Sequence, residues 1–281
     1  MLGYRHAYHA GNHADVLKHV VLVQLLDYMA SRGKPFWYID THCGAGAYRL
    51  DDGPAARHGE YREGIGRLWN CADLPPALAR YVELVRQLNP DDDLRRYPGS
   101  AWLAASIVVP ESRLWLYELH PADFATLETR FAGDRDRVRV YQEDGFAALR
   151  GLLPPAPRRA LVLMDPSYEV ADDYARVTEA LGDSLRRFAT GTYALWYPML
   201  RRREADRLPR QLAALDARAW LHARLTVRRR PMDDGGLYGS GMYVINPPYT
   251  LPGILDAALP ALASRLAQDD SPGFTLDFEI P

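Results

Sequence analysis

The stretch Phe36-Trp37-Tyr38-Ile39-Asp40-Thr41-His42-Cys43-Gly44-Ala45-Gly46 decides the fold class. Its four leading aromatic and aliphatic residues predict a short buried strand, and the polar, glycine-containing residues after them predict a turn. A buried strand that ends in a glycine-rich turn is typical of the first unit of a nucleotide-binding α/β fold.

The segments on either side of this stretch continue the same pattern. Residues 14–29 carry apolar side chains at helical spacing, with Asn12 as the N-cap. Further apolar runs predict strands, in chain order, at residues 113–118, 138–141, 161–164, 191–197, 223–228 and 241–245, the last of these being the final strand. Helical patterns fall between them, at residues 121–131, 145–149, 172–188 and 209–215. We therefore predict an α/β, Rossmann-like sheet of about seven mostly parallel strands, with helices on both faces.

One spacing in this pattern is unusually long. Asp40 and Glu118, which end the first two strands, are 78 positions apart, whereas the corresponding acid of a Rossmann unit follows after about 20 residues. Helix-like stretches separated by glycine and proline fill the interval. We expect residues 53–98 to form a small helical insert within a single domain that spans residues 1–281.

Composition restricts the class of protein. Apolar residues make up 48% of the chain and charged residues 25%, which are ordinary values for a globular protein. Two cysteines are too few for a disulfide scaffold, and no apolar run approaches the roughly 18 residues of a membrane span. We expect a cytoplasmic protein with no membrane association. The net charge of −2 argues against nucleic-acid binding by bulk charge, but Arg201-Arg202-Arg203 and Arg228-Arg229-Arg230 allow local basic patches.

Candidate ligand-binding residues stand at the ends of four predicted strands. They are the Gly44-Ala45-Gly46 turn, Glu118, Asp144 with Gly145, and Asp165. Ligands of doubly wound sheets bind at these strand ends. Glu118 can accept hydrogen bonds from ribose hydroxyls and Asp144 from an adenine amine, so the order is that of an S-adenosylmethionine (SAM) site. Each acid also has a purely structural interpretation as a helix cap.

Asp165-Pro166-Ser167-Tyr168 predicts chemistry on an exocyclic amine. An acceptor on the N–H and a neighbouring backbone carbonyl can pull the amine towards tetrahedral geometry, and Pro166 fixes the turn that aims this carbonyl. Tyr168 can stack on an extruded base. The structural alternative is a simple strand-ending turn.

A second segment matches the same pattern. Asn246-Pro247-Pro248-Tyr249 has the (Asp or Asn)-Pro-Pro-aromatic sequence of amino-methyltransferases. We prefer Asp165 because it ends the fourth strand, beside the glycine-rich turn. Asn246 is expected to follow a strand at the edge of the sheet.

The sequence resembles the RlmJ family of bacterial adenine-N6 methyltransferases, which act on 23S ribosomal RNA. The likeness spans nearly the whole chain, and the N-terminal run is its most specific part. The matching segments are Tyr4-Arg5-His6, His9 to His19, Asp40-Thr41-His42 with Gly44-Ala45-Gly46, Tyr97-Pro98-Gly99-Ser100, Glu118-Leu119-His120-Pro121, Asp144-Gly145-Phe146 and Ala194-Leu195-Trp196-Tyr197-Pro198.

The resemblance implies roles for matching positions. Asp165 is implied as the catalytic acceptor and a neighbour of the cofactor, with Pro166 supplying the carbonyl and Tyr168 the stacking ring. Tyr4, Lys18 and Tyr168 are implied to contact the RNA. The sequence departs from the family pattern at Ser167, where the family has proline. The SAM pocket is implied to include His19, His42, Gly44, Gly46, Ser100, Glu118, Asp144 and Gly145.

We therefore expect SAM-dependent methyl transfer to N6 of an adenine in 23S ribosomal RNA by direct displacement. We expect a monomer without an obligate protein partner. The alternatives are a DNA adenine-N6 methyltransferase, for which no separate DNA-reading domain is visible, and a non-catalytic RNA-binding protein of the same fold.

Other chemistries fit the sequence poorly. We expect no metal site, because Gly11-Asn12 interrupts the helical spacing of His9 and His13. Cys43 and Cys71 are not placed as the nucleophile that pyrimidine C5 methylation needs. Gly239-Ser240-Gly241 is not the nucleophile elbow of hydrolases.

Overall fold

The computed structural model describes residues 5–233 and 236–280. Its α-helices are α1 (His13–Ser31), α2 (Gly53–His58), α3 (Gly66–Trp69), α4 (Pro76–Gln87), α5 (Ser100–Ile107), α6 (Pro121–Phe131), α7 (Gly145–Leu152), α8 (Asp172–Arg187), α9 (Arg203–Ala213) and α10 (Leu251–Arg265). Short 3-10 helices are η1 (His6–Tyr8) and η2 (Glu60–Glu63). The strands are β1 (Trp37–Asp40), β2 (Ala47–Arg49), β3 (Arg96–Pro98), β4 (Arg113–Tyr117), β5 (Val138–Tyr141), β6 (Ala160–Met164), β7 (Thr192–Met199), β8 (Trp220–Thr226), β9 (Gly239–Ile245) and β10 (Gly273–Glu279).

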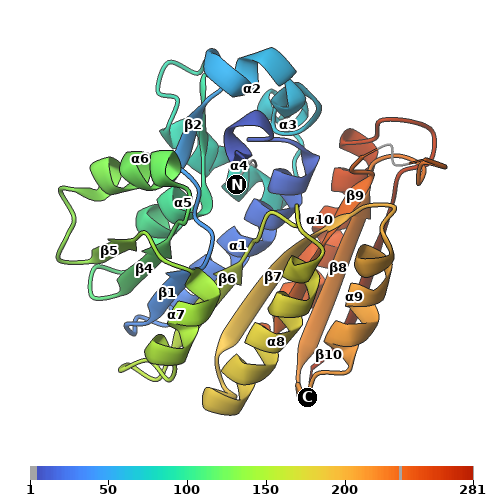
Figure 1. The fold of residues 1–281 in the computed structure, drawn as a ribbon. Coiled ribbons are helices and arrows are strands. Elements are labelled where there is room, and N and C mark those ends of the chain that lie inside the picture. Colours follow the sequence, from blue (N-terminus) through green and yellow to red (C-terminus); the bar gives the residue numbers. More distant parts are fainter. Residues whose placement is uncertain (1–4, 234–235, 281) are drawn as a thin grey trace.

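The main sheet has eight strands in the order β10-β8-β9-β7-β6-β1-β4-β5 (Figure 1). Strands β5, β4, β1, β6 and β7 are parallel, whereas β9 is antiparallel to β7 and β8, and β10 is antiparallel to β8. The strand order reverses between β1 and β6, which is where ligands bind in doubly wound sheets. The predicted Rossmann-like, mostly parallel sheet is confirmed. The strand count is corrected from about seven to eight, because β10 follows the strand that we expected to be the last.

Helices cover both faces of the sheet (Figure 1). Residues of α1, α4, α5 and α10 pack in one apolar cluster, and residues of α7, α8 and α9 pack in another. The strands alternate between the clusters: Leu161 and Leu163 belong to the first, and Val162 and Met164 to the second. This period of two is the pleat of a strand that is buried on both faces.

Helix α1 lies within the core rather than on the surface. Asn12 caps it, because its side chain accepts hydrogen bonds from the backbone N–H groups of Ala14 and Asp15. Its first half is buried on every side, whereas its second half has a partly exposed face formed by Gln24, Asp27, Tyr28 and Ser31. Its first turns bury Asp15, Lys18 and His19, which need partners inside the protein.

The long interval between β1 and β4 contains most of the smaller elements. Helices α2, α3 and α4, together with η2, lie between β2 and β3, which pair antiparallel as a separate two-stranded sheet. In Figure 1 this region rises above one end of the main sheet, beside the N-terminal segment. Gly64 of this region approaches the chain before α1 so closely that a Cβ there would lie 2.0 Å from the carbonyl oxygen of Gly11.

The structure corrects the expected place of Asn246-Pro247-Pro248-Tyr249. The strand before it, β9, is not at the edge, because it pairs with β7 on one side and β8 on the other. Since β9 is antiparallel to β7, Asn246 follows it at the end of the sheet opposite to Asp165. Asn246 donates from its side chain to the carbonyls of Ala189 and Gly191. These two hydrogen bonds give Asn246 a structural role at the end of the sheet away from Asp165.

No helix within residues 5–233 and 236–280 has both the length and the apolar character to cross a membrane.

Candidate active site

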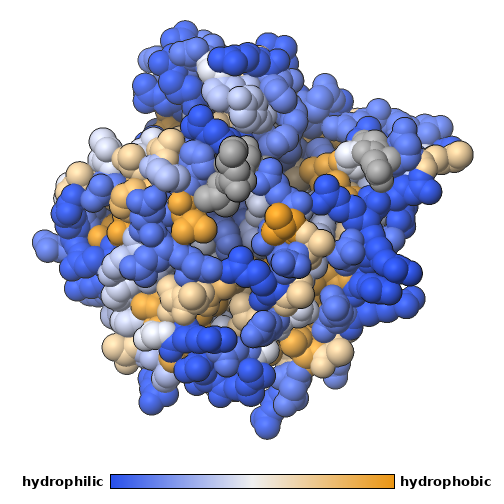
Figure 2. All heavy atoms as spheres, in the orientation of Figure 1, coloured by the Kyte–Doolittle hydropathy of each residue, from blue (hydrophilic) through white to orange (hydrophobic). Residues whose placement is uncertain are grey.

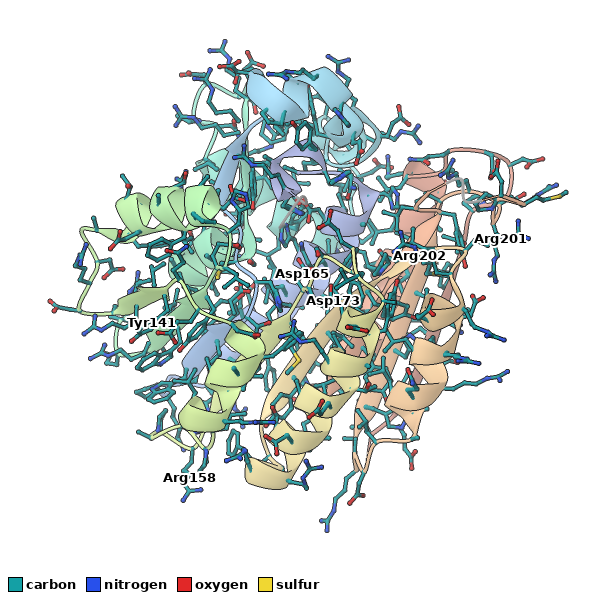
Figure 3. The ribbon with its side chains drawn as sticks, viewed as in Figure 1. Tyr141, Arg158, Asp165, Asp173, Arg201 and Arg202 are labelled. Atoms are coloured by element: carbon teal, nitrogen blue, oxygen red, sulfur yellow. The ribbon has the colours of Figure 1, made fainter. Side chains whose placement is uncertain are left out.

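The carboxyl ends of the parallel strands enclose a cavity of about 330 Å³, which we call the strand-end cavity. The turn after β1, Glu118 after β4, Asp144 after β5 and Asp165 after β6 all line it. Figure 3 shows Asp165 near the middle of the molecule, where the strand ends converge. Residues that are far apart in sequence thus meet at the place where the strand order reverses.

A buried carboxylate organises the turn after β1. Asp40 is fully buried and accepts hydrogen bonds from Tyr38 Oη (2.7 Å) and Ser100 Oγ (2.6 Å). The backbone N–H of His42 also donates to Asp40 Oδ1, at 3.3 Å. Burial raises the pKa of Asp40, and these donors oppose the increase. Ser100, one of the predicted cofactor residues, is therefore held at the cavity wall by Asp40.

Gly44 is placed where a side chain cannot fit. Its φ is 60°, and a Cβ there would lie 2.1 Å from Tyr48 Oη. Its backbone N–H donates to Glu118 Oε2 at 2.8 Å, so the glycine turn and the end of β4 are joined. Gly44 and Glu118 both line the strand-end cavity.

Gly46 has a different place from the one expected. It does not line the strand-end cavity; instead it lies under α6, where a Cβ would come within 2.8 Å of Leu127 Cδ1. Its carbonyl accepts the backbone N–H of Gly99 at 2.9 Å. The sequence motif was interpreted as two cofactor-binding glycines, but only Gly44 faces the cavity.

The two acids that the sequence assigns to a ribose and an adenine both line the cavity. Glu118 accepts backbone hydrogen bonds from Gly44 and from His120 (2.6 Å to Oε1), and burial raises its pKa. Asp144 caps α7 through Oδ1, which accepts from Phe146 N at 3.0 Å. Its Oδ2 pairs with Arg176 of α8 at 2.5 Å. The capping role and the cavity position coexist, because one carboxylate has several acceptor sites.

Gly145 brings α7 against the β1 turn. A Cβ on Gly145 would lie 2.2 Å from the backbone oxygen of Thr41. The helix start therefore lines the strand-end cavity at a distance that only glycine allows.

Two predicted histidines line the same cavity as neutral side chains. Burial lowers the pKa of His19 to about 3 and that of His42 to about 4. His19 Nδ1 pairs with Tyr97 Oη at 2.8 Å, and His42 Nδ1 pairs with Thr41 Oγ1 at 2.7 Å. Neutral imidazoles suit a pocket that admits a cationic ligand better than imidazolium ions would.

Asp165 forms part of a buried charge cluster with α1. Lys18 Nζ lies 2.5 Å from Asp165 Oδ2 and 2.7 Å from Asp15 Oδ1. Burial alone lowers the pKa of an ammonium, but the two carboxylates outweigh it and raise the pKa of Lys18. Asp15 also pairs with His6 Nε2 at 2.9 Å. Burial opposes ionisation of Asp15, yet His6 and Lys18 lower its pKa well below the usual value. Lys18 therefore stays charged between the two carboxylates, with Asp15 as its ionised partner.

A second, larger cavity of about 620 Å³ adjoins the first; we call it the outer cavity. Its walls come from the N-terminal segment, the 58–63 region, the loop after β6 and the loops after β7 and β8. The residues that line both cavities are His6, Lys18, Asp165, Ser167 and Glu169. Asp165 therefore stands at the junction, accessible from either side. Pro166 lines only the strand-end cavity.

Tyr168 and Lys18, two of the predicted substrate contacts, line the outer cavity and are almost fully buried. The Tyr168 hydroxyl donates to the carbonyl of Trp196 at 2.8 Å, and its ring packs 4.6 Å from that of Tyr174. The Lys18 ammonium is shared by two carboxylates. Both side chains therefore have partners within the protein, and their contact with RNA stays a prediction. Tyr4 lies outside the described residues.

Sequence reasoning missed several residues of the site. Asp15 had a signal: an acid three positions before Lys18 in an otherwise apolar helix predicts a buried ion pair. No sequence signal marks Tyr48 or Arg176. Tyr48 reaches the cavity through the pairing of β2, and Arg176 through the packing of α8. His6 lines both cavities; the resemblance includes it in the matching N-terminal run without giving it a role.

Polar contacts hold the histidine-rich N-terminal segment to Glu60. His9 Nδ1 lies 3.0 Å from Glu60 Oε1, and Asn12 Nδ2 donates to Glu60 Oε2 at 3.0 Å. Across the described ranges 5–233 and 236–280, no group of three or more His, Cys, Asp or Glu side chains is arranged to hold a metal ion.

Comparison with known proteins identifies the family. Residues 33–279 match the family model described as "Ribosomal RNA large subunit methyltransferase D, RlmJ". Two proteins named "Ribosomal RNA large subunit methyltransferase J" align over all of this chain and all of their own length. The one from Haemophilus influenzae (strain ATCC 51907 / DSM 11121 / KW20 / Rd) is 44% identical, and the one from Escherichia coli (strain K12) is 43% identical.

A solved structure has the same fold. Protein LPL1258 from Legionella pneumophila str. Philadelphia 1 superimposes with a TM-score of 0.88 at 33% identity, over 96% of this chain and 98% of that one. The likeness covers the main sheet and the 53–98 region alike, since so little of either chain is left out. Together, the family model and the full-length relatives show that this chain belongs to the RlmJ family of ribosomal RNA large subunit methyltransferases.

Proposed function

We propose that this enzyme transfers a methyl group from SAM to N6 of an adenine in 23S ribosomal RNA. Family membership supports a ribosomal RNA methyltransferase of the large subunit. The observation that carries the choice of the amine is the position of Asp165, which stands at the junction of two cavities beside Pro166. A methyl donor in one cavity and a base in the other would meet at this carboxylate.

The strand-end cavity fits SAM by its chemistry. Its volume of about 330 Å³ lies within the range of small-molecule pockets. Glu118 offers a carboxylate to ribose hydroxyls, and Asp144 offers one to an adenine amine at the start of α7. The turn at Gly44 forms part of the cavity wall, with its backbone N–H held by Glu118. When bound, SAM supplies an electrophilic methyl group on a sulfonium centre.

Asp165 and Pro166 would act on the accepting amine. Asp165 accepts a hydrogen bond from the N6 amine and draws its lone pair out of conjugation with the ring. The carbonyl of Pro166 accepts the second N–H. With SAM bound, the amine nitrogen would bond to the methyl carbon in line as the sulfonium C–S bond breaks and S-adenosylhomocysteine leaves, and the amine proton would pass to Asp165 or to water. Lys18 and Asp15 hold the Asp165 side chain in place.

We propose that the enzyme acts as a monomer without an obligate protein partner. Ribosomal RNA as the substrate supports a cytoplasmic setting. We treat residues 1–281 as one methyltransferase domain and residues 53–98 as its insert, which contributes Glu60 and Glu63 to a cavity wall.

Methylation of unmodified 23S ribosomal RNA by the purified protein tests the proposal. We expect labelled methyl groups from SAM to appear as N6-methyladenine, identified by mass spectrometry of the nucleosides. Asp165→Ala should lower turnover by at least 100-fold while S-adenosylhomocysteine (SAH) binding, measured by calorimetry, survives. Asp172→Ala, on the exposed start of α8, is the matched control. Methylation of duplex DNA in preference to RNA, or Asp165→Ala turnover within about tenfold, would contradict it.

A further inference from the structure

The outer cavity has one basic wall. Arg202, from the loop after β7, and Arg228, from the loop after β8, both line it. These loops are joined, because Tyr238 N donates to Met199 O at 3.2 Å and Val227 N donates to Tyr238 O at 3.0 Å. We use the term arginine shelf for Arg201, Arg202, Arg203 and Arg228. Both arginine runs of the sequence therefore converge on one rim of the cavity that ends at Asp165.

The arginines of the two runs differ in their ion pairs. Arg230 pairs with Asp206 at 2.7 Å, and Arg229 lies 3.8 Å from Asp270, so these two are counterbalanced. Arg201 and Arg203 are exposed and have no ion pair within the part of the chain that the structure describes. Figure 3 shows Arg201 and Arg202 on the same side of Asp165, with the Arg201 side chain directed outward. Figure 2 shows a mostly hydrophilic surface on this side.

Arg202 connects the shelf to the Asp165 loop. Its Nη1 donates to the carbonyl of Tyr168 at 3.0 Å, so the shelf is fixed relative to the loop that carries Asp165. Arg228 lies close enough to His13 to lower the pKa of that side chain, although burial lowers it more. The positive charge of the shelf thus faces into the outer cavity as well as outward.

The facing wall carries two acids that are already paired. Glu60 and Glu63 line the outer cavity from the 58–63 region; Glu60 is held by His9 and Asn12, and Glu63 pairs with Arg67. A polyanion that enters this cavity therefore finds its attraction at the arginine shelf and none at the facing wall. This asymmetry favours a nucleic acid strand that lies along the shelf.

We propose that the arginine shelf binds the backbone phosphates of the RNA strand beside the target adenine, so that the base enters the outer cavity towards Asp165. This inference rests on the proposed function for the identity of the base. It explains how a protein of net charge −2 can bind RNA, because the positive charge is gathered on one rim instead of spread over the surface. Arginine suits the role, since its planar fork can bind two phosphate oxygens.

The test measures RNA affinity as a function of salt concentration. The ligand is 23S ribosomal RNA transcribed in vitro, and SAH is present so that no methylation occurs. The Arg201→Gln/Arg203→Gln variant avoids Arg202, whose loss would disturb the Asp165 loop. Losing two phosphate contacts should reduce the slope of log K against log [salt] by about 1.4 to 1.8 and weaken binding about tenfold at physiological salt.

The control removes the same charge elsewhere. Arg158 and Arg218 are exposed and lie at the opposite end of the sheet, where β6 and β8 begin, and Figure 3 shows Arg158 there. Arg158→Gln/Arg218→Gln should keep the wild-type slope to within a few tenths. The Arg201→Lys/Arg203→Lys variant retains the charge and should keep most of the salt dependence.

The outcomes separate this proposal from the proposed function. If the shelf variant and the control have equal slopes and affinities, the shelf does not bind phosphates, whatever the enzyme methylates. If the shelf variant has the reduced slope but the wild type forms no N6-methyladenine, phosphate binding by the shelf is supported and the proposed function is wrong. In a methylation assay the shelf variant should raise KM for RNA about tenfold with kcat nearly unchanged, since Arg201 and Arg203 do not touch the reacting atoms.

Discussion

At the scale of single residues, the choice of lysine at position 18 stands out. The chain has 34 basic residues, and Lys18 and Lys34 are its only lysines. A compact ammonium with three donors can sit between Asp15 and Asp165, whereas the broad fork of arginine cannot take the same place without moving one of them. Burying this charge cluster is costly unless every member is paired.

Removing the ammonium should therefore affect both stability and catalysis. We expect Lys18→Met to lower the free energy of unfolding by about 3 to 5 kcal/mol, because two buried carboxylates lose their cation. The turnover number kcat should fall as well, since the Asp165 side chain loses the contact that holds it in place. Lys18→Arg should restore neither property. Urea unfolding and methylation rates measure these effects.

Lys34→Met is the matched control, because Lys34 is exposed. It should leave both measurements near those of the wild type. A Lys18→Met enzyme with unchanged stability and kcat would show that the cluster has no such role.

The sequence predicts which kinds of side chain form this site better than it predicts the directions in which those side chains point. Asp165-Pro166 was located from its place after a buried strand, and the structure brings it to the cavities. Tyr168 is predicted to stack on a base, and the motif gives no sign that its ring packs against Tyr174 and Trp196. A side-chain direction depends on neighbours that are distant in sequence, so a local motif does not determine it.

At the scale of elements, the start of α7 controls the distance between a helix and the β1 turn. The backbone oxygen of Thr41 lies where a Cβ of Gly145 would be. Helix α7 can approach only because this residue lacks a side chain. Asp144, which caps the same helix, is thereby set at the cavity wall.

Gly145→Ala should push α7 away from the turn. We expect a loss of about 1 to 3 kcal/mol in stability from overpacking against backbone, and at least tenfold weaker SAH binding because Asp144 is displaced. Gly151→Ala near the other end of α7 is the control: no atom lies within 4 Å of its Cβ position among the described residues. It should stabilise the protein by about 0.4 to 1 kcal/mol. Calorimetry and thermal unfolding compare the two; equal SAH affinities would refute the argument.

Helices and strands with a clear hydrophobic period are predicted well from the sequence, whereas the strand at the edge of the sheet is not. The bounds of α6 and β5 agree with the expected 121–131 and 138–141. Strand β10 was missed because it is an edge strand whose Phe274 and Phe278 are exposed, so no buried face marks it. Helix α9 begins at Arg203, before the expected residue 209, because Pro209 lies inside the helix and does not start it.

At the scale of the whole molecule, buried neutral histidines make stability depend on pH. Burial lowers the pKa of His13, His42 and His222 to about 4 and that of His19 to about 3. In the unfolded chain these side chains titrate near 6.5. Between the two values the unfolded chain binds protons that the folded protein does not. Stability is therefore complete above about pH 6.5 and falls as the pH drops towards 4.

His222 offers a test outside the active site. It lies in β8, and its Nε2 is 2.7 Å from Tyr197 Oη, with Arg224 and Asp277 nearby. We expect His222→Gln to reduce the slope of unfolding free energy between pH 6 and pH 5 by up to about 1.4 kcal/mol per pH unit, the effect of one proton. Urea unfolding across this range measures the slope. A variant slope equal to that of the wild type would mean that His222 is protonated in the folded protein.

The meeting of the two cavities at Asp165 has a consequence for inhibition. A single compound that links an adenosyl half to a second purine can fill both spaces, with its linker passing the shared carboxylate. An amine in that linker would carry a positive charge next to Asp165. Tethering makes the second contact intramolecular, so such a bisubstrate ligand should bind far more tightly than either half alone.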